Sequence, residues 1–148
     1  MNSSPELDGT REAMRNILRD CRVIAVVGLS PKPHRDSFHV SQYMQSRGYR
    51  IVPVNPNARE VLGQPAYATL EDAARHERID LVNCFRNSED IPPLVASAIA
   101  IGAKAVWMQL GIVNPAAAGQ ARAAGLQVVE NRCIMVEHAA LAGRGQLD

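Results

Sequence analysis

The sequence predicts an α/β fold, a Rossmann-like doubly wound parallel sheet of five strands, or six if "PAYA" at 65–68 pairs, with helices on both faces. Two observations support this prediction. Short apolar runs rich in Val and Ile alternate with amphipathic segments of 8 to 15 residues. The 148 residues suffice for one domain with a sizeable core and are too few for two comfortable ones.

The first two elements illustrate the pattern. Residues 10–20 carry apolar side chains at helical spacing, which predicts a short amphipathic helix. Residues 22–28, "RVIAVVG", form a continuous apolar run that stops at Gly28. Such a run is typical of a strand buried on both faces.

The alternation continues to the end of the chain. Further strands are expected at 49–56, 79–85, 104–111 and 126–131. Further helices are expected at 37–48, 69–76, 88–102 and 114–125. Thr69 with Asp72 suggests a capping pattern, and Asn114 followed by Pro115 suggests another helix start. We therefore predict a flexible N-terminus at 1–9, one domain at 10–141 and a flexible C-terminus at 142–148.

The expected strand order places a ligand site at one edge of the sheet. Right-handed crossovers put the strand at 23–28 beside the one at 80–85, with the chain reversing direction between them. Ligands of such folds bind outside the carboxyl ends of the strands at this switch point. The loops "GLSPKPHR", "PVNPN", "CFRNSE", "QLGIVN" and "ENRC" should gather there.

Composition excludes several functions. The net charge of +1 and the aromatic content of 4% argue against nucleic acid as a partner. No apolar run is long enough to span a membrane, and the N-terminus lacks the pattern of a secretory signal. Three cysteines, an odd number, match no disulfide or zinc framework. We expect a reduced, cytoplasmic protein that contacts neither membrane nor nucleic acid.

The loop after the first strand suits an anion. Backbone N–H groups at a helix N-terminus carry part of the helix dipole and bind phosphates without special side chains. Lys32 and Arg35 add positive charge, and Ser30 adds a hydroxyl donor. In the alternative interpretation these charges are merely solvated, and Asp36 or Ser37 is only the N-cap.

A dinucleotide site should look different. It would contain G-x-G-x-x-G and an acidic residue about 20 positions later for the ribose hydroxyls. This loop has only Gly28, and Asn55 and Asn57 stand where the carboxylate should be. NAD is disfavoured but stays an alternative, and the G-x-x-x-x-G-K-[ST] loop of nucleoside triphosphate sites is absent.

Four segments together resemble a known family. These are "VVGLSPKPHRDSFHVSQYMQSRGYRIVPVNPNAREVLGQPAYATLED", "VNCFRNSEDIPPLV", "AIGAKAVWMQLGIVN" and "AGLQVVENRCIMVEH". They are similar to the small stand-alone CoA-binding proteins, which resemble the N-terminal CoA-binding domain of the succinyl-CoA synthetase alpha subunit. The resemblance covers roughly residues 15–141, and the combination of motifs is specific although each piece alone is weak. Asp36 departs from the family loop, which tends to have Pro after the Arg.

The resemblance implies CoA as the ligand and assigns site residues. The phosphates would be met by Gly28, Ser30, Lys32 and Arg35, and the nucleotide would be bordered by Asn55 and Pro56. The adenosine or the pantetheine arm would be lined by Phe85 and Arg86. The pantetheine would also pass near Gln109 and Gly111. Two of these assignments have structural alternatives. Arg86 can instead pair with Glu89 or Asp90, and Phe85 can be a core residue.

Three functions therefore compete. The leading hypothesis is a CoA or acyl-CoA binding module, sensor or accessory subunit, with no catalytic activity expected from the chain alone. The second is a CoA-dependent thiol or thioester enzyme using Cys84 or Cys133, for which no activating base shares a short motif with Cys84. The third is an NAD-binding regulator. Cys133 and His138 offer no complete metal ligand set, so no metal site is predicted, and the protein partner is not predicted.

Overall fold

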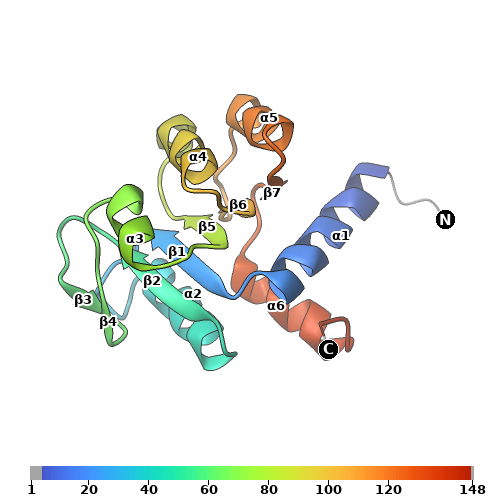
Figure 1. Ribbon diagram of the computed structural model, residues 1–148. Coiled ribbons are helices and arrows are strands. Elements are labelled where there is room, and N and C mark those ends of the chain that lie inside the picture. Colours follow the sequence, from blue (N-terminus) through green and yellow to red (C-terminus); the bar gives the residue numbers. More distant parts are fainter. Residues whose placement is uncertain (1–4, 148) are drawn as a thin grey trace.

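The computed structural model describes residues 5–147, and its core is a parallel sheet of five strands (Figure 1). The strand order is β2-β1-β5-β6-β7. The strands are β1 (Val23–Val27), β2 (Arg50–Val54), β5 (Leu81–Cys84), β6 (Ala105–Met108) and β7 (Gln127–Val129). All four pairings are parallel, so the carboxyl ends of all five strands lie at the same edge. The predicted fold class is confirmed.

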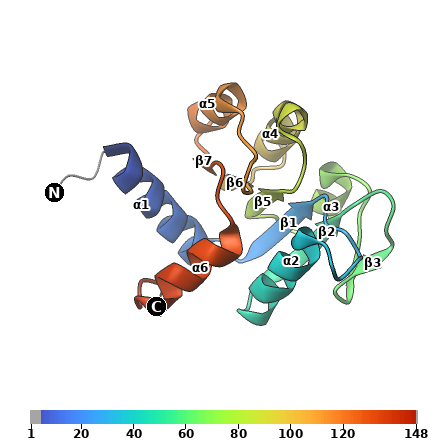
Figure 2. The same ribbon diagram turned by 180° about the vertical axis from the view of Figure 1, so that it is seen from behind.

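Helices cover both faces of the sheet. The helices are α1 (Pro5–Asp20), α2 (Asp36–Ser46), α3 (Leu70–His76), α4 (Ile91–Ala100), α5 (Pro115–Ala123) and α6 (Ile134–Gly143). A 3₁₀ turn, η1 (Ser88–Asp90), precedes α4. One apolar core lies between the sheet and α3, α4 and α5, and the other lies between the sheet and α1, α2 and α6 (Figures 1 and 2).

The two cores follow from the alternation of side chains along each strand. In β1, Ala25 and Val27 face the core of α3, α4 and α5, whereas Ile24 and Val26 face the opposite core. Ile24, Ala25 and Val26 are completely buried. Burial on both faces explains why the strand is apolar at every position rather than at every second one.

The predicted switch point is confirmed at β1 and β5. Residues Val27 and Cys84 are partners in the register of these two adjacent strands. After β1 the chain passes through α2 to β2, on one side of β1. After β2 it passes through α3 to β5, on the other side of β1. The loops after β1 and β5 therefore leave the same edge in diverging directions.

The stretch "PAYA" does not form a sixth strand of this sheet. Pro65 ends a small antiparallel hairpin of β3 (Glu60–Val61) and β4 (Gln64–Pro65). Tyr67 then makes a single parallel bridge to Val54. The chain turns into α3 at Thr69, whose hydroxyl accepts a hydrogen bond from the amide of Asp72, as the capping pattern predicts. A pairing of one residue is too short to continue the sheet.

The ends of the chain hold more helix than expected. Helix α1 begins at Pro5, inside the segment expected to be flexible, while residues 1–4 of that segment lie outside the described residues. Helix α6 was not predicted and reaches Gly143, inside the expected C-terminal tail. Within residues 5–147, no helix is both long and apolar enough to cross a membrane.

Candidate functional site

A cleft of about 840 Å³ opens at the carboxyl edge of the sheet, next to the switch point. Its walls come from the start of α2, from the loops after β5 and β6, and from the start of α6. The lining residues are Asp36, His39, Val40, Phe85, Arg86, Asn87, Ser88, Glu89, Gln109, Leu110, Gly111, Ile112, Cys133, Met135 and Val136. A cleft in this position is where doubly wound sheets bind ligands.

Gly28 ends β1 and lies against the chain that follows β5. Its φ of +88° belongs to the region that favours glycine, and its amide donates to the carbonyl oxygen of Val54 at 2.9 Å. A Cβ at this position would overlap the carbonyl oxygen of Phe85 and lie 3.2 Å from Cδ of Arg86. Glycine therefore allows the loop after β1 to pack directly beside the wall of the cleft.

The loop after Gly28 is held by its own serines. The Ser37 hydroxyl accepts a hydrogen bond from the Ser30 amide at 3.0 Å, and the Ser30 hydroxyl accepts one from the Lys32 amide at 3.1 Å. Ser37 is buried, whereas Lys32 and Arg35 are exposed. The N-cap of α2 is Arg35, with extended backbone and no side-chain cap, rather than Asp36 or Ser37. The side chains of Lys32 and Arg35 therefore make no hydrogen bond that caps α2.

Asn55 connects β2 to the same loop. Its side-chain amide donates to the carbonyl oxygen of Leu29 at 2.9 Å, and its side-chain oxygen accepts from the amide of Asn57 at 2.8 Å. Pro56, beside it, is exposed. The polar groups of Asn55 are used in holding two loops together.

Phe85 and Arg86 form the wall contributed by β5. Phe85 is partly buried and packs against the core of α1, α2 and α6. Arg86 is exposed and lies 3.7 Å from a carboxylate oxygen of Asp90. Both structural alternatives for these residues are therefore present in the fold, and both residues also line the cleft.

Gln109 is a buried residue that lines the cleft and makes hydrogen bonds to two other segments. Its Nε2 donates to Oδ1 of Asn83 at 2.6 Å, and its Oε1 accepts from the amide of Ile134 at 3.3 Å. It therefore joins β5 and β6 to the start of α6. Gly111, with a φ of +84°, donates its amide to Oδ1 of Asn131 at 2.7 Å. These bonds fix the loop after β6 against the loop after β7.

The three cysteines differ in accessibility. Cys84 is completely buried in β5, and burial raises the pKa of its thiol to about 12. Cys21 is also buried, and burial, followed by the Asp80 carboxylate, raises its pKa to about 11. Cys133, at the N-cap of α6, is half-buried and lines the cleft. Cys84 therefore lacks the exposure and the thiolate character of a reactive cysteine.

His138 belongs to the core rather than to the cleft. Its Nδ1 lies 3.0 Å from the Tyr43 hydroxyl, and its ring packs edge-on against Tyr43 and Tyr49. Burial lowers the pKa of His138, and the charges of Arg47 and Arg22 lower it further. The imidazole joins α6 to α2, and it does not line the cleft as Cys133 does. Among the described residues no cluster of metal-ligating side chains is found.

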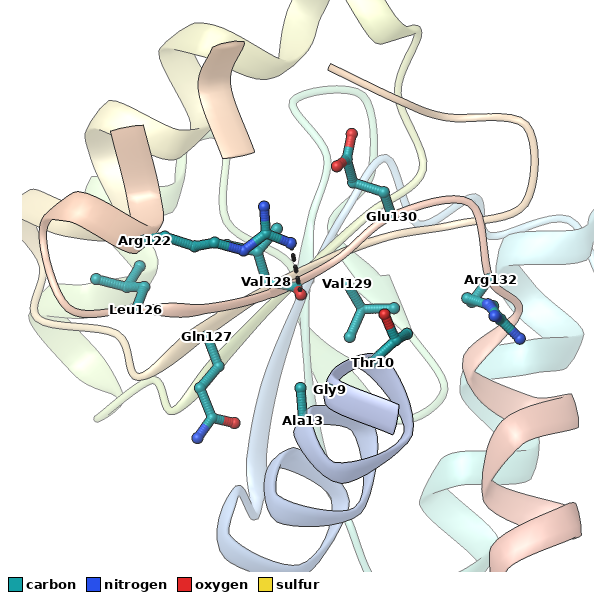
Figure 3. Close-up of a pocket in the computed structure, with 10 residues that line it drawn as sticks. All are labelled: Gly9, Thr10, Ala13, Arg122, Leu126, Gln127, Val128, Val129, Glu130 and Arg132. Carbon is teal, nitrogen blue, oxygen red and sulfur yellow. Dashed lines mark hydrogen bonds between the residues drawn. The ribbon is translucent and has the colours of Figure 1, made fainter. Parts of the chain in front are cut away.

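A second cleft, of about 730 Å³, lies between α1 and the edge strand β7 (Figure 3). The charged side chains that line it already have partners within the fold. Arg122 donates to the carbonyl oxygen of Val128 at 3.4 Å, and Glu130 accepts from the amide of Asn114 at 2.9 Å. Arg132 lies 3.6 Å from Glu137. This cleft is distant in the strand order from β1 and is not the site expected at the switch point.

The candidate residues fall into two groups. Phe85, Arg86, Gln109 and Gly111 line the cleft. Gly28, Ser30, Lys32, Arg35, Asn55 and Pro56 belong to the adjoining loops and do not line it. Sequence reasoning missed the wall formed by α6, because no helix was predicted after the last strand. The apolar Met135 and Val136 directly after the strand-end loop were the available signal.

The chain is thus a Rossmann-like domain with a cleft at the carboxyl edge of its sheet. Residues 22–139 match the CoA binding domain family, so the chain belongs to that family. A Bacillus subtilis (strain 168) protein, YneT, is 39% identical over 130 residues, which are 88% of this chain and 95% of YneT.

Solved structures agree at the level of the fold. A protein from Pyrococcus horikoshii OT3 is 41% identical with a TM-score of 0.87, and the match covers 97% of this chain and all of that chain (100%). An acetyl-coenzyme A synthetase from Ca. Korarchaeum cryptofilum is 20% identical with a TM-score of 0.66. The latter match covers 76% of this chain and 26% of the synthetase. At that identity the similarity concerns the fold alone.

Proposed function

We propose that the protein binds CoA or acyl-CoA at the carboxyl edge of the sheet. It acts as a binding module, sensor or accessory subunit without catalysis of its own. The observation that carries the proposal is the cleft beside the switch point in a member of the CoA binding domain family. Two cationic side chains, Lys32 and Arg35, stand on the loop that adjoins this cleft.

The chemistry of the edge suits the parts of CoA. Lys32, Arg35 and the N-terminus of α2 would meet the phosphates. The ion pair of Arg86 with Asp90 is long and exposed, and such pairs contribute less than about 1 kcal/mol, so a phosphate can replace Asp90 as the partner. Phe85 and the loop of Gly111 would border the adenosine and the pantetheine arm.

The same observations disfavour NAD. Asn55, at the end of β2, uses its side chain on Leu29 and Asn57 and has no carboxylate to accept ribose hydroxyls. Catalysis through Cys84 is disfavoured by its burial and raised pKa. Cys133 lines the cleft, so a thiol function, if the protein has one, belongs to Cys133.

Titration calorimetry with Arg35→Ala tests the proposal. The protein should bind CoA, and NAD much more weakly. Loss of one charge-assisted hydrogen bond should weaken CoA between about tenfold and a hundredfold and leave pantetheine, which has no nucleotide phosphates, nearly unchanged. A loss shared by CoA and dephospho-CoA would locate Arg35 at the pyrophosphate, and a loss for CoA alone would locate it at the 3′-phosphate.

Arg78→Ala is the matched control. Arg78 is also exposed, but it precedes β5 and so lies at the opposite edge of the sheet. Its replacement should not change the affinity for CoA. Equal binding of NAD and CoA would refute the ligand assignment. Equal losses for pantetheine and CoA in Arg35→Ala would refute the position of the phosphates.

A further inference from the structure

Large apolar side chains are exposed on two segments of the described surface, the loop after β6 and the first turn of α6. Within residues 9–147, these are Leu110, which is 72% exposed, Val136, which is 55% exposed, and Val113, which is 45% exposed. Leu110 and Val113 follow β6, and Val136 is in the first turn of α6. Exposed apolar side chains that share one cleft are typical of a ligand-binding groove. Leu110 and Val136 line the cleft at the carboxyl edge, whereas Val113 does not.

The lining of the cleft changes along the strand order. Near β1 and β5 it includes the charged or polar side chains of Asp36, His39 and Arg86. Farther along, the loop after β6 contributes Leu110 and Ile112. The first turn of α6 adds Met135 and Val136. The exposed charged side chains of the cleft thus belong to α2 and the loop after β5, beside the cationic loop, and its exposed apolar side chains, Leu110 and Val136, form the apolar end.

We propose that the apolar end holds the acyl chain of an acyl-CoA, and that the protein prefers thioesters of short to medium saturated chains over free CoA. This inference rests on the proposed function. The phosphates of CoA and its thiol are at opposite ends of an extended arm. A ligand with its phosphates at the cationic loop therefore directs its thiol end toward the loop after β6. Free CoA ends at its thiol beside this loop, whereas an acyl chain continues past the thiol and covers Leu110 and Val136.

The size of the apolar surface favours a chain of a few carbons over a protein. A stable protein interface buries about 800 Å² on each partner, from 20 to 30 residues a side. The two exposed apolar side chains at the cleft, Leu110 and Val136, cover much less than that area. A saturated chain needs only the two that line the cleft, with the half-buried Ile112 and Met135 beside them.

Calorimetry with CoA, acetyl-CoA, butanoyl-CoA, hexanoyl-CoA and octanoyl-CoA tests the proposal. Each methylene that leaves water should tighten binding by up to about fourfold. We expect hexanoyl-CoA to bind at least about tenfold more tightly than acetyl-CoA, and the gain to stop once the cleft is filled. Affinities that do not depend on chain length, with CoA still bound, would overturn this inference and leave the proposed function standing. Absence of binding by every CoA compound would overturn both.

The variant Leu110→Ser with Val136→Ser locates the effect. Both side chains are on the surface, so the fold should be retained, and the ratio of the acetyl-CoA and hexanoyl-CoA dissociation constants should fall below about threefold. Val113→Ser removes an exposed apolar side chain from the same loop outside the cleft and should keep the wild-type ratio. An unchanged ratio in the double variant would contradict the proposal. Sedimentation analysis tests whether a second copy of this chain covers the surface instead. If the wild-type protein is a dimer and the double variant is a monomer, the surface is an interface between two copies and the proposal is overturned.

Discussion

At the scale of single residues, Gly28 connects the fold to the site. Its positive φ lets β1 turn at the edge of the sheet, and the absence of a Cβ lets the chain after β5 approach. Glycine meets both requirements because it has no Cβ. The side chain at this position therefore controls how closely the cationic loop and the wall of the cleft pack together.

We expect Gly28→Ala to lower the free energy of unfolding by about 3 kcal/mol, because a left-handed conformation and an overlap with Phe85 each cost about 1–2 kcal/mol. Denaturant unfolding measures this loss. Gly48→Ala is the matched control: its φ is +92°, but no atom lies within 4 Å of a Cβ there, so it should lose only about 1 kcal/mol. Equal losses in the two variants would contradict the close approach at Gly28.

His138 makes a second prediction at this scale. Its pKa is lowered, so the unfolded chain binds a proton more readily than the folded one at pH values between the ordinary 6.5 and the lowered pKa. Stability should be constant with respect to this group above about pH 6.5. It should fall as the pH drops through that window, with a slope of up to about 1.4 kcal/mol per pH unit.

Unfolding of His138→Gln as a function of pH checks the assignment. The variant keeps a polar group near the Tyr43 hydroxyl but cannot titrate, so this part of the pH dependence should disappear. His34→Gln, which alters an exposed loop histidine, should retain it. If His34→Gln rather than His138→Gln removes the dependence, the buried imidazole is not its source.

At the scale of elements, Asp80 ties two strands together at the edge opposite the cleft. It precedes β5, and its Oδ2 accepts hydrogen bonds at 3.0 Å from the amides of Arg22 and Val23, where β1 begins. Burial raises the pKa of Asp80, but these two amides and the Lys104 ammonium at 3.6 Å outweigh it, so the net shift is downward. The side chain aligns the two strands that form the switch point.

Replacement of Asp80 by Ala should therefore lower the free energy of unfolding by about 3 kcal/mol, because two amides lose a charged acceptor. Asp80→Asn retains one acceptor oxygen and should lose less. Lys104→Ala removes only a half-exposed ion pair and should lose under about 1 kcal/mol. Chemical denaturation ranks the three variants. A loss for Lys104→Ala as large as that for Asp80→Ala would mean that the ion pair, not the amide bonds, carries the stabilisation.

At the scale of the whole molecule, the two packed layers decide which thiols meet solvent. Cys21 and Cys84 lie in the two cores, and Cys133 lies at the cleft. In the native protein a disulfide reagent such as DTNB should react quickly with one thiol, which Cys133→Ser removes. All three thiols should react after denaturation. CoA should slow the labelling of the native protein, and rapid labelling that survives in Cys133→Ser would contradict the packing described above.

The sequence alone predicted much of the fold. Continuous runs of Val and Ile indicated strands buried on both faces. Their alternation with amphipathic segments predicted the parallel sheet and its switch point. These features are local or follow from chain connectivity, so they can be recognised without coordinates. Helix α6 was missed because its apolar residues face both the core and the cleft, which blurs the one-sided pattern of an amphipathic helix.

The site, like the fold, was predictable from the sequence only in part. The sequence by itself determined the edge of the sheet, the cationic loop and the residues after β5 and β6, since motifs and strand ends are visible in one chain. Only the tertiary structure decided that Gln109 bonds to Asn83, that Cys84 is sealed in the core and that Val136 faces the cleft with Leu110. Each of these facts depends on contacts between residues far apart in the sequence, such as Asn83 and Gln109, which are 26 positions apart, and such contacts exist only when the sheet and its helices have packed.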